Sequence, residues 1–377
     1  MPTSAPAPEP IPFLDVRAAY LELQGELDAA AARVLASGRY VLGEEVEAFE
    51  AEFAAYCGAR ACVATGNGLD ALRLTIEALG VRPGDEVIVP AHTFIATWLG
   101  VHHAGARPVP VEPDARTYLL DPERVAALVG ARTRGIVAVH LYGRPADMAA
   151  LNEIAARHGL WLIEDAAQAH GARAASRACG SLGRAAAFSF YPAKNLGAFG
   201  DGGAVVTDDA RLAERVRLLG NYGAASKYEH VVKGHNSRLD PLQAAFLRVR
   251  LRRLDAWNER RRALAAAYDA GLAGLSGLSR PPADDEARSA WHLYVVAHAH
   301  RDALRRRLAE RGIETGVHYP VPPHRSPAFA GSHDGAGLPI TERLAQTVVS
   351  LPIGPHLLPA QVERVVAAVR AFAAEPR

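Results

Sequence analysis

Hydrophobic residues in the first two thirds of the chain fall into short runs separated by longer amphipathic stretches. Residues 68–80 and 146–159 repeat apolar positions every three or four residues, which predicts helices. The short runs are apolar at almost every position, as in strands buried on both faces of a sheet. Seven runs are expected to be strands: residues 61–65, 85–90, 107–113, 134–140, 160–165, 186–190 and 203–209. This alternation predicts an α/β fold with a mostly parallel seven-stranded sheet and helices on both faces.

The pattern changes after Pro241. A long helical stretch follows, and the seven arginines between Arg248 and Arg262 are typical of a solvated helix face. Next come an apolar run at 291–297, helical patterns at 301–312 and 359–373, and a loop rich in proline and histidine at 316–324. We therefore divide the chain into a loose tail at 1–10, a large domain at 11–250 and a smaller α+β domain at 251–377.

The composition excludes several classes of protein. The chain has 377 residues, of which 49% are hydrophobic and 22% charged, as in a folded globular protein. Its net charge of +1 gives no general attraction to nucleic acid or membranes. The three cysteines lack metal-ligand spacing, and no apolar run approaches the ~20 residues of a membrane span. We expect a cytoplasmic protein with no metal site and no nucleic-acid or membrane partner.

A glycine-containing turn lies between the first predicted strand and the first predicted helix. In "ATGNGLDAL", Gly66, Gly68 and Ala71 fit the G-x-G-x-x-G/A pattern of dinucleotide sites. The acidic pair that should end the next strand, Asp85 and Glu86, begins that strand instead, which argues against a dinucleotide. A single phosphate at the helix N-terminus fits better, because free N–H groups and the helix dipole favour an anion. The alternative is a tight structural turn.

Asp165 ends the strongly apolar run in "WLIEDAAQAHG". In a parallel sheet this position brings a carboxylate to the edge where ligands bind. Gln168 follows within one turn and can contact the same ligand. The alternative is that Asp165 only caps a following helix.

Lys194 stands alone among glycines, aromatics and small residues in "SFYPAKNLGAFGDGG". It follows a predicted strand, so it also lies at the carboxyl edge of the sheet. An apolar setting lowers the pKa of a lysine, and the neutral amine can form a Schiff base with an aldehyde.

The glycine-containing turn in "ATGNGLDAL" is called the phosphate turn below. Together with Asp165 and Lys194, it matches one cofactor. Pyridoxal phosphate carries a phosphate, a pyridine nitrogen that an aspartate can keep protonated, and an aldehyde. Phe94, in "PAHTFIATW", is placed to stack on its ring, although a core aromatic is the alternative. No G-x-S-x-G elbow supports a hydrolase.

Nearly the whole chain, from "FLDVRAAY" to the last helix, resembles the DegT/DnrJ/EryC1/StrS family of sugar aminotransferases, which use pyridoxal phosphate and have fold type I. The motifs are "LIEDAAQAHGA", "FSFYPAKNLGAFGDGGAVVTDD", "NSRLDPLQAAFLRVRL" and "ERGIETGVHYPVPPH". The resemblance implies that Lys194 holds the cofactor and acts as acid and base. It implies that Asp165 pairs with the pyridine nitrogen. The remaining implied cofactor contacts are Gly68, Leu69, Phe94, Gln168, Ser189 and, from the second subunit of a homodimer, Asn236.

Three departures from the usual family motifs bear on the substrate. "NGL" replaces S-G-T in the phosphate turn, Tyr191 replaces a histidine, and Asp201 replaces a glutamate. With "GVHYPVPPH", they are similar to the branch that aminates nucleotide-linked 3-keto-6-deoxyhexoses for antibiotics or surface glycans. The expected sugar contacts are Tyr191, Lys227, Tyr228, His318 and Tyr319, with Lys227 and Tyr228 at the diphosphate.

We therefore expect transamination of a keto sugar on a nucleoside diphosphate, with dTDP as the expected nucleotide, L-glutamate as amino donor and the pyridoxamine form arising in turnover. The alternatives are a 4-keto-sugar aminotransferase, a pyridoxamine-dependent dehydratase and a non-catalytic regulatory homologue. A dehydratase of this fold has histidine in place of the lysine, so Lys194 argues against it. A nicotinamide oxidoreductase is the most distant alternative.

Overall fold

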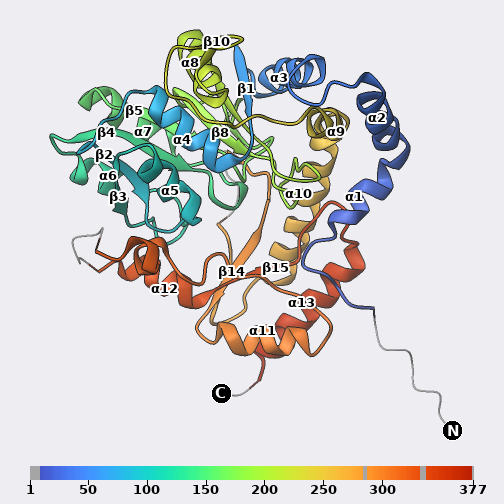
Figure 1. The fold of residues 1–377 in the computed structure, drawn as a ribbon. Helices are drawn as coiled ribbons and strands as arrows, with labels where there is room; N and C mark the ends of the chain where they lie inside the picture. Colours follow the sequence, from blue (N-terminus) through green and yellow to red (C-terminus); the bar gives the residue numbers. More distant parts are fainter. Residues whose placement is uncertain (1–8, 283–286, 332–336, 376–377) are drawn as a thin grey trace.

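The computed structural model describes residues 9–282, 287–331 and 337–375. A seven-stranded sheet forms the centre of the upper part of the molecule (Figure 1). In spatial order, its strands are β1 (Ala61–Thr65), β9 (Gly203–Thr207), β8 (Ala185–Ser189), β5 (Trp161–Asp165), β4 (Thr133–Val139), β2 (Glu86–Pro90) and β3 (Arg107–Val111). Strand β9 runs antiparallel to both neighbours, and the other pairs are parallel. All seven predicted strands and the mostly parallel sheet are confirmed.

Helices cover both faces of this sheet. Apolar side chains of α3 (Glu44–Cys57), α6 (Pro122–Leu128), α7 (Met148–His158) and α9 (Pro241–Leu251) form the core on one face. Those of α4 (Gly68–Ala78), α5 (Ile95–His103) and α8 (Ala210–Gly220) form it on the other. Neighbouring residues of β5 point to opposite faces, so Leu162 joins the first core and Ile163 the second. Both faces are buried, which explains the continuous apolar runs in the sequence.

Local sequence signals set the ends of the helices that flank the site. Helix α7 begins where the Asp147 carboxylate accepts a hydrogen bond from the Ala150 N–H at 3.0 Å. It ends at Gly159, whose φ of 64° suits a residue without a side chain. Helix α4 begins in the same way, with the Asn67 side chain accepting from the Asp70 N–H at 2.8 Å. The start of α4 is therefore fixed next to the phosphate turn.

A second core lies below the large sheet, in the orange and red part of Figure 1. It contains a three-stranded antiparallel sheet of β12 (Leu278–Ser279), β14 (Tyr294–His298) and β15 (Val348–Leu351). Around it lie α10 (Leu254–Gly271), α11 (Arg301–Ala309), α12 (Pro339–Thr347) and α13 (Pro359–Ala373). Ile11 is fully buried in this core and forms a bridge with Ile313. The predicted division after residue 250 falls at the end of α9 and stays a prediction.

The remaining elements are short or peripheral. Helices α1 (Val16–Glu22) and α2 (Gln24–Ser37) contribute to an apolar cluster with α9. The short strands are β6 (Arg173–Ala174), β7 (Arg177–Ala178), β10 (Ala224–Ser226), β11 (Glu229–His230) and β13 (Ala287–Arg288). Single 3-10 turns cover Leu141–Gly143, Pro323–Arg325 and Pro327–Phe329. No helix in the described part of the chain is long and apolar enough to cross a membrane.

Only the last part of the apolar run at 291–297 lies in a strand, since β14 begins at Tyr294. Trp291 has a φ of 45°, which breaks the strand. The backbone before β14 instead bonds to the turn after β4, since the Ala290 N–H donates to the Gly143 carbonyl at 2.9 Å. This connection brings His292 to the cavity described below.

Side chains bond to backbone groups at one edge of the large sheet, on strand β1. On β1, the Ala64 N–H donates to the Glu50 carboxylate at 2.8 Å, and the Cys62 carbonyl accepts from Arg217 at 3.4 Å. Glu50 and Arg217 also form a two-point ion pair, with contacts of 3.1 and 2.6 Å. The Ala64 N–H and the Cys62 carbonyl are therefore satisfied without another strand.

Candidate active site

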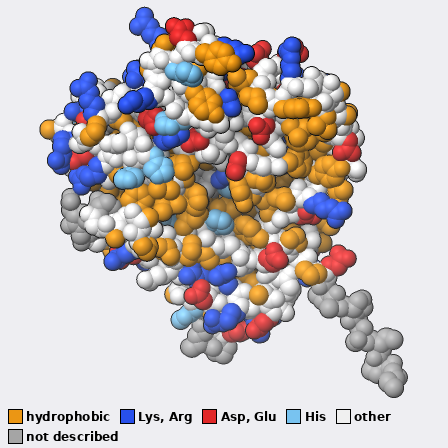
Figure 2. Space-filling view, in the orientation of Figure 1, with side chains coloured by type: hydrophobic (Ala, Val, Ile, Leu, Met, Phe, Trp, Pro, Cys, Tyr) orange, Lys and Arg blue, Asp and Glu red, His pale blue; other side chains and the backbone are white. Residues whose placement is uncertain are grey.

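A cavity of about 620 Å³ lies at the carboxyl edge of the large sheet. The turns after β1, β2, β5 and β8 form one wall, and residues 292, 318 and 319 from the lower part form the other. Hydrophobic side chains gather across the middle of the face seen in Figure 2, between the two parts of the molecule. Ten of the thirteen predicted site residues line the cavity: Gly68, Leu69, Phe94, Asp165, Gln168, Ser189, Tyr191, Lys194, His318 and Tyr319.

The phosphate turn leaves backbone donors free at the start of α4. The Asp70 N–H bonds to the Asn67 side chain and the Ala71 N–H to the Asn67 carbonyl. The Gly68 and Leu69 N–H groups have no hydrogen bond within the described residues. A Cβ on Gly68 would lie 2.6 Å from that of Ser189, so only glycine lets the two turns meet. This arrangement suits an anion at a helix N-terminus.

Asp165 is almost completely buried at the end of β5. Its Oδ2 accepts from the Thr97 hydroxyl at 2.8 Å, and its Oδ1 from the Ala167 N–H at 3.2 Å. Burial raises the pKa of Asp165, while these two hydrogen bonds and Lys194 oppose the increase. A turn, not a helix, follows Asp165, so the helix-cap alternative is wrong. The carboxylate is held in place and faces the cavity.

Thr97 and Thr93 support Asp165 and were not predicted. Because the Thr97 hydroxyl gives its single proton to Asp165, it must accept from Thr93, whose Oγ1 lies 2.9 Å away. Both threonines are buried and line the cavity. Their separation by four positions in "TFIAT", about one helical turn, was the only signal in the sequence.

Lys194 lies on the turn after β8, with its amine close to Asp165. Its Nζ has no hydrogen-bond partner among the described residues. Burial lowers the pKa of Lys194 to about 8, and Asp165 opposes that decrease. At pH 7, about a tenth of such an amine is neutral, far more than for an exposed lysine. A Cβ on Gly197 would lie 2.4 Å from the Pro192 carbonyl, so the tight turn requires glycine there.

Gln168, on the turn after β5, connects this wall of the cavity to the loop that contains Tyr319. Its Oε1 accepts from the Tyr142 N–H at 2.6 Å, which leaves its Nε2 as a donor to the Tyr319 hydroxyl at 2.8 Å. The ring centroid of Tyr319 lies 5.4 Å from that of Phe94, which is half exposed at the start of α5. Two aromatic rings therefore line one edge of the cavity.

The two histidines of the cavity are neutral. Burial lowers the pKa of His318 to about 4 and the pKa of His292 well below its usual value, with Lys194 adding to both effects. His292 Nδ1 lies 3.1 Å from Asn195 Oδ1, and His318 Nδ1 lies 2.8 Å from Ser350 Oγ. Lys194 is the single lysine or arginine among the described residues that line the cavity.

A model of the DegT/DnrJ/EryC1/StrS aminotransferase family matches residues 22–370 of the chain. The chain belongs to this family. It is 58% identical over 364 residues to dTDP-3-amino-3,4,6-trideoxy-alpha-D-glucose transaminase of Streptomyces venezuelae, with 96% of both chains covered. It is also 56% identical to the erythromycin biosynthesis sensory transduction protein EryC1 of Saccharopolyspora erythraea, covering 96% of this chain and all of the relative.

A solved structure supports the same family. The DesV protein of S. venezuelae, crystallised in complex with a ketimine intermediate, superposes with a TM-score of 0.96 at 57% identity, covering 98% of this chain and 100% of DesV. Aminotransferases of the DegT/DnrJ/EryC1/StrS family depend on pyridoxal phosphate. The predicted family and the predicted enzyme class, an aminotransferase, are confirmed.

Three predicted site residues of this aminotransferase lie outside the cavity. Lys227 and Tyr228 lie on the exposed β10–β11 hairpin, where the lysine amine is 5.2 Å from the tyrosine ring centroid. The Tyr228 side chain is 85% exposed. Asn236 is also exposed, and its side chain has no hydrogen bond within the described residues. These residues therefore do not reach the cavity of their own chain.

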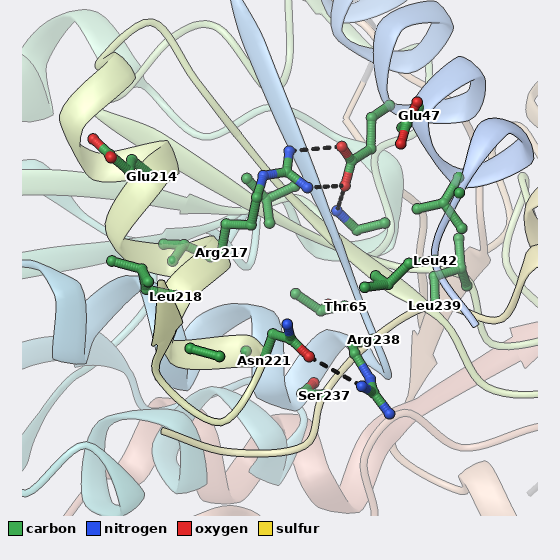
Figure 3. Close-up of a pocket in the computed structure, with 18 of the residues that line it drawn as sticks. Leu42, Glu47, Thr65, Glu214, Arg217, Leu218, Asn221, Ser237, Arg238 and Leu239 are labelled. Carbon is green, nitrogen blue, oxygen red and sulfur yellow. Dashed lines mark hydrogen bonds and ion pairs between the residues drawn. The ribbon is translucent and has the colours of Figure 1, made fainter. Parts of the chain in front are cut away.

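A second cavity, of about 450 Å³, lies behind the phosphate turn (Figure 3). Thr65 lines it and donates to the Asn67 carbonyl at 3.0 Å. On one side, Arg217 reaches the carboxylate of Glu50; on the other, Arg238 donates to the Asn221 side chain at 3.0 Å. Asn221 and Asn236 form a backbone bridge, so this cavity adjoins the exposed Asn236.

One cluster could be mistaken for a metal site. His140, Glu164 and Cys179 lie close together and are fully buried or nearly so. However, Glu164 accepts from the N–H groups of residues 180, 182 and 183, each at 2.8 Å. His140 Nδ1 accepts from the Ala146 N–H, so its Nε2 must donate to Glu164 at 2.8 Å. The imidazole and the carboxylate are already used in hydrogen bonds. The bond between them links the end of β4 to β5.

Proposed function

We propose that this protein transfers the amino group of L-glutamate to C3 of a dTDP-linked 3-keto-6-deoxyhexose, in the synthesis of an aminosugar for an antibiotic or a surface glycan. The observation that carries this proposal is the cavity that combines a free anion-binding turn, a buried carboxylate and a lysine of lowered pKa. The 58% identity to a transaminase named for a dTDP-3-amino sugar supports the substrate and the position of amination. A cytoplasmic location accords with such biosynthetic chemistry.

The side chains fit pyridoxal phosphate as the cofactor. The unpaired N–H groups of Gly68 and Leu69, with the Ser189 hydroxyl, would bind the phosphate. Ser189 Oγ accepts from the Tyr191 N–H at 3.3 Å, which leaves its proton free to donate. Asp165 would hold a proton on the pyridine nitrogen, and the buried carboxylate gains the cationic partner that it needs. Gln168 would donate to the ring hydroxyl, and Phe94 would cover the ring.

When bound, this cofactor stabilises negative charge on the carbon that carries the amino group. The chain supplies the proton transfers and the orientation. The neutral amine of Lys194 would remove a proton from glutamate and later deliver one to the sugar carbon, with the amino group carried by the pyridoxamine form of the cofactor. The hydrogen bonds from Thr97 and the Ala167 N–H would keep the Asp165 carboxylate oriented toward the pyridine nitrogen. Tyr191, His318 and Tyr319 orient the sugar against the wall that carries Lys194.

The negatively charged diphosphate of the nucleotide sugar requires a cationic partner, which this cavity lacks. Lys194 is committed to the chemistry, and both histidines are neutral. We therefore propose a homodimer in which Lys227 and Tyr228 of the partner subunit hold the diphosphate and Asn236 of the partner subunit binds the cofactor phosphate. Support comes from their exposure and from the exposed hydrophobic residues near the second cavity, of which Tyr40, Val41 and Leu42 are 55%, 56% and 39% exposed.

The test offers dTDP-linked 3-keto and 4-keto 6-deoxyhexoses separately, with excess glutamate, and identifies the products by mass spectrometry and NMR. The proposal expects efficient amination of the 3-keto sugar and a 3-amino product. Amination of the 4-keto sugar alone would overturn the position of attack and leave the cofactor chemistry standing. Absence of turnover with both sugars, together with a cofactor absorption band that glutamate does not change, would favour a regulatory homologue.

A further inference from the structure

The turn after β4 joins the two walls of the active-site cavity, although it does not line that cavity. Tyr142 in this turn has a φ of 61°, a conformation that costs a non-glycine residue roughly 1 kcal/mol or more. Gly143 follows with a φ of 97°, and a Cβ there would lie 2.8 Å from the His292 backbone nitrogen. A strained residue that the surrounding structure holds in place is a reason to look for a function.

The side chain of Tyr142 connects the large sheet to the loop below the cavity. Its hydroxyl forms a short hydrogen bond with the His318 carbonyl, and it lies 2.8 Å from His92 Nε2. A carbonyl only accepts, so the tyrosine proton points to His318 and the hydroxyl oxygen accepts from His92. His92 must therefore carry its proton on Nε2. Burial lowers the pKa of His92 to about 4, which keeps it in this neutral form.

The backbone of Tyr142 contacts the opposite wall. Its N–H donates to Gln168 Oε1 at 2.6 Å, and this bond determines which end of the amide is the donor. Gln168 Nε2 then donates to the Tyr319 hydroxyl, so the tyrosine keeps its own proton for a ligand in the cavity. Burial raises the pKa of Tyr319, so that proton is retained at neutral pH. The Tyr142 carbonyl also accepts from the Leu293 N–H at 3.2 Å.

We propose that Tyr142, supported by His92, is a positioning residue that sets the His318–Tyr319 loop at a fixed distance from the Gln168 wall. The backbone of Tyr142 holds the wall that faces the cofactor, and its hydroxyl holds the loop that faces the sugar. The separation of these two surfaces decides how the sugar carbon meets the cofactor, and a shift of about 1 Å in such a pair can cost roughly 10²-fold in rate. This inference rests on the proposed function.

Tyr142→Phe separates the two connections because it keeps the N–H bond to Gln168 and removes the hydroxyl. We expect KM for the keto sugar to rise about tenfold, as for loss of a buried hydrogen bond. The visible absorption of the bound cofactor should not change, since Gln168 remains fixed. In hydrogen–deuterium exchange without substrate, a peptide covering residues 316–322 should exchange faster, while one covering 161–169 should not.

A matched pair at His92 provides the control. His92→Gln keeps an N–H donor near the position of Nε2, whereas His92→Leu removes it. We expect His92→Leu to raise KM for the sugar by only roughly threefold, because Tyr142 keeps its bond to His318 in both variants. His92→Gln should restore the original KM, because it keeps a donor to the Tyr142 hydroxyl. If Tyr142→Phe does not fold, this pair decides the matter.

Three results would overturn the inference. The first is an unchanged KM and unchanged exchange at 316–322, with only a lower melting temperature, which is the result expected of simple packing. The second is a shift of the cofactor absorption in Tyr142→Phe, which would place its effect on the Gln168 wall. The third is equal KM values for the two His92 variants. If the unaltered protein aminates no 3-keto sugar, the proposed function fails, and the exchange experiment still tests the role of Tyr142.

Discussion

The wall of the cavity that faces the cofactor and the wall that faces the sugar are built differently. The first consists of turns directly after strands of one sheet, and Asp165 there has its hydrogen-bond partners within the same chain. The second consists of a loop from the lower part of the molecule, and the proposed diphosphate contacts Lys227 and Tyr228 project into solvent elsewhere. The side chains proposed to hold the cofactor ring therefore come from one chain, whereas the proposed contacts to the diphosphate and the cofactor phosphate would come from a second chain.

The largest effect is expected from Lys194→Ala. Loss of a general base costs about 10²–10⁴-fold, and loss of the covalent attachment adds to it, so turnover should be undetectable. Borohydride reduction of the holoenzyme should attach a pyridoxyl group to Lys194, as read by peptide mapping. The chain has only two other lysines, Lys227 and Lys233, and labelling of either would contradict the assignment.

Asp165→Asn tests whether the wall that faces the cofactor acts through the charge of its carboxylate. An amide cannot hold the pyridine proton, so glutamate-driven conversion of the cofactor should slow by about 10²–10³-fold, as for loss of a preorganised electrostatic group. Stopped-flow absorbance with glutamate alone measures this step. Thr97→Val is the milder companion, since it removes one hydrogen bond but keeps the carboxylate. A normal rate in Asp165→Asn would show that the carboxylate is only structural.

Mixed dimers test the need for a second chain directly. Lys194→Ala and Asn236→Ala chains should each be inactive alone. After unfolding and refolding at equal amounts, half of the dimers are mixed and carry one intact site of two, so about a quarter of normal activity should return. Light scattering gives the mass of the active species. A fully active monomer would refute the shared site.

The pH dependence of cofactor capture tests the environment of Lys194. Only the neutral amine reacts, and its pKa is about 8, so the fraction of reactive amine rises as pH increases through 8. The rate at which the apoprotein captures pyridoxal phosphate should increase about tenfold between pH 7 and pH 9 and then level off. A rate that still increases in proportion to hydroxide above pH 9 would mean that the lysine keeps its ordinary pKa.

A smaller effect than for the catalytic residues is expected at the diphosphate. Lys227→Ala should raise KM for the dTDP sugar by roughly tenfold and weaken its dependence on salt, because a point-charge contact with phosphate is lost. KM for glutamate, which has no diphosphate, should not change. Lys233→Ala removes an equal charge from the same exposed segment and serves as the control. Equal effects of the two variants would indicate general electrostatic attraction rather than a contact.

The contrast between the two walls also explains what could be predicted from the sequence. Buried strands produce continuous apolar runs, so all seven were found, and residues at their ends, such as Asp165 and Lys194, could be assigned to one edge. Thr97 supports Asp165 from 68 positions away, and Tyr142 meets His318 across 176, so no local pattern reveals either contact. The apolar pattern of residues 291–297 also did not show that the strand begins only at Tyr294, because residues 290 and 293 bond to the turn at 141–143 instead. The family resemblance, not spacing, pointed to Asn236.

The paired backbone groups at the β1 edge limit how two copies can meet. An open edge strand is a template on which any extended segment can add, which leads to uncontrolled polymers as readily as to dimers. Here the Glu50 carboxylate and the Arg217 guanidinium occupy backbone groups that such a segment would use. Strand addition by a second copy is therefore disfavoured at this edge of the sheet, because two of its backbone groups are already paired.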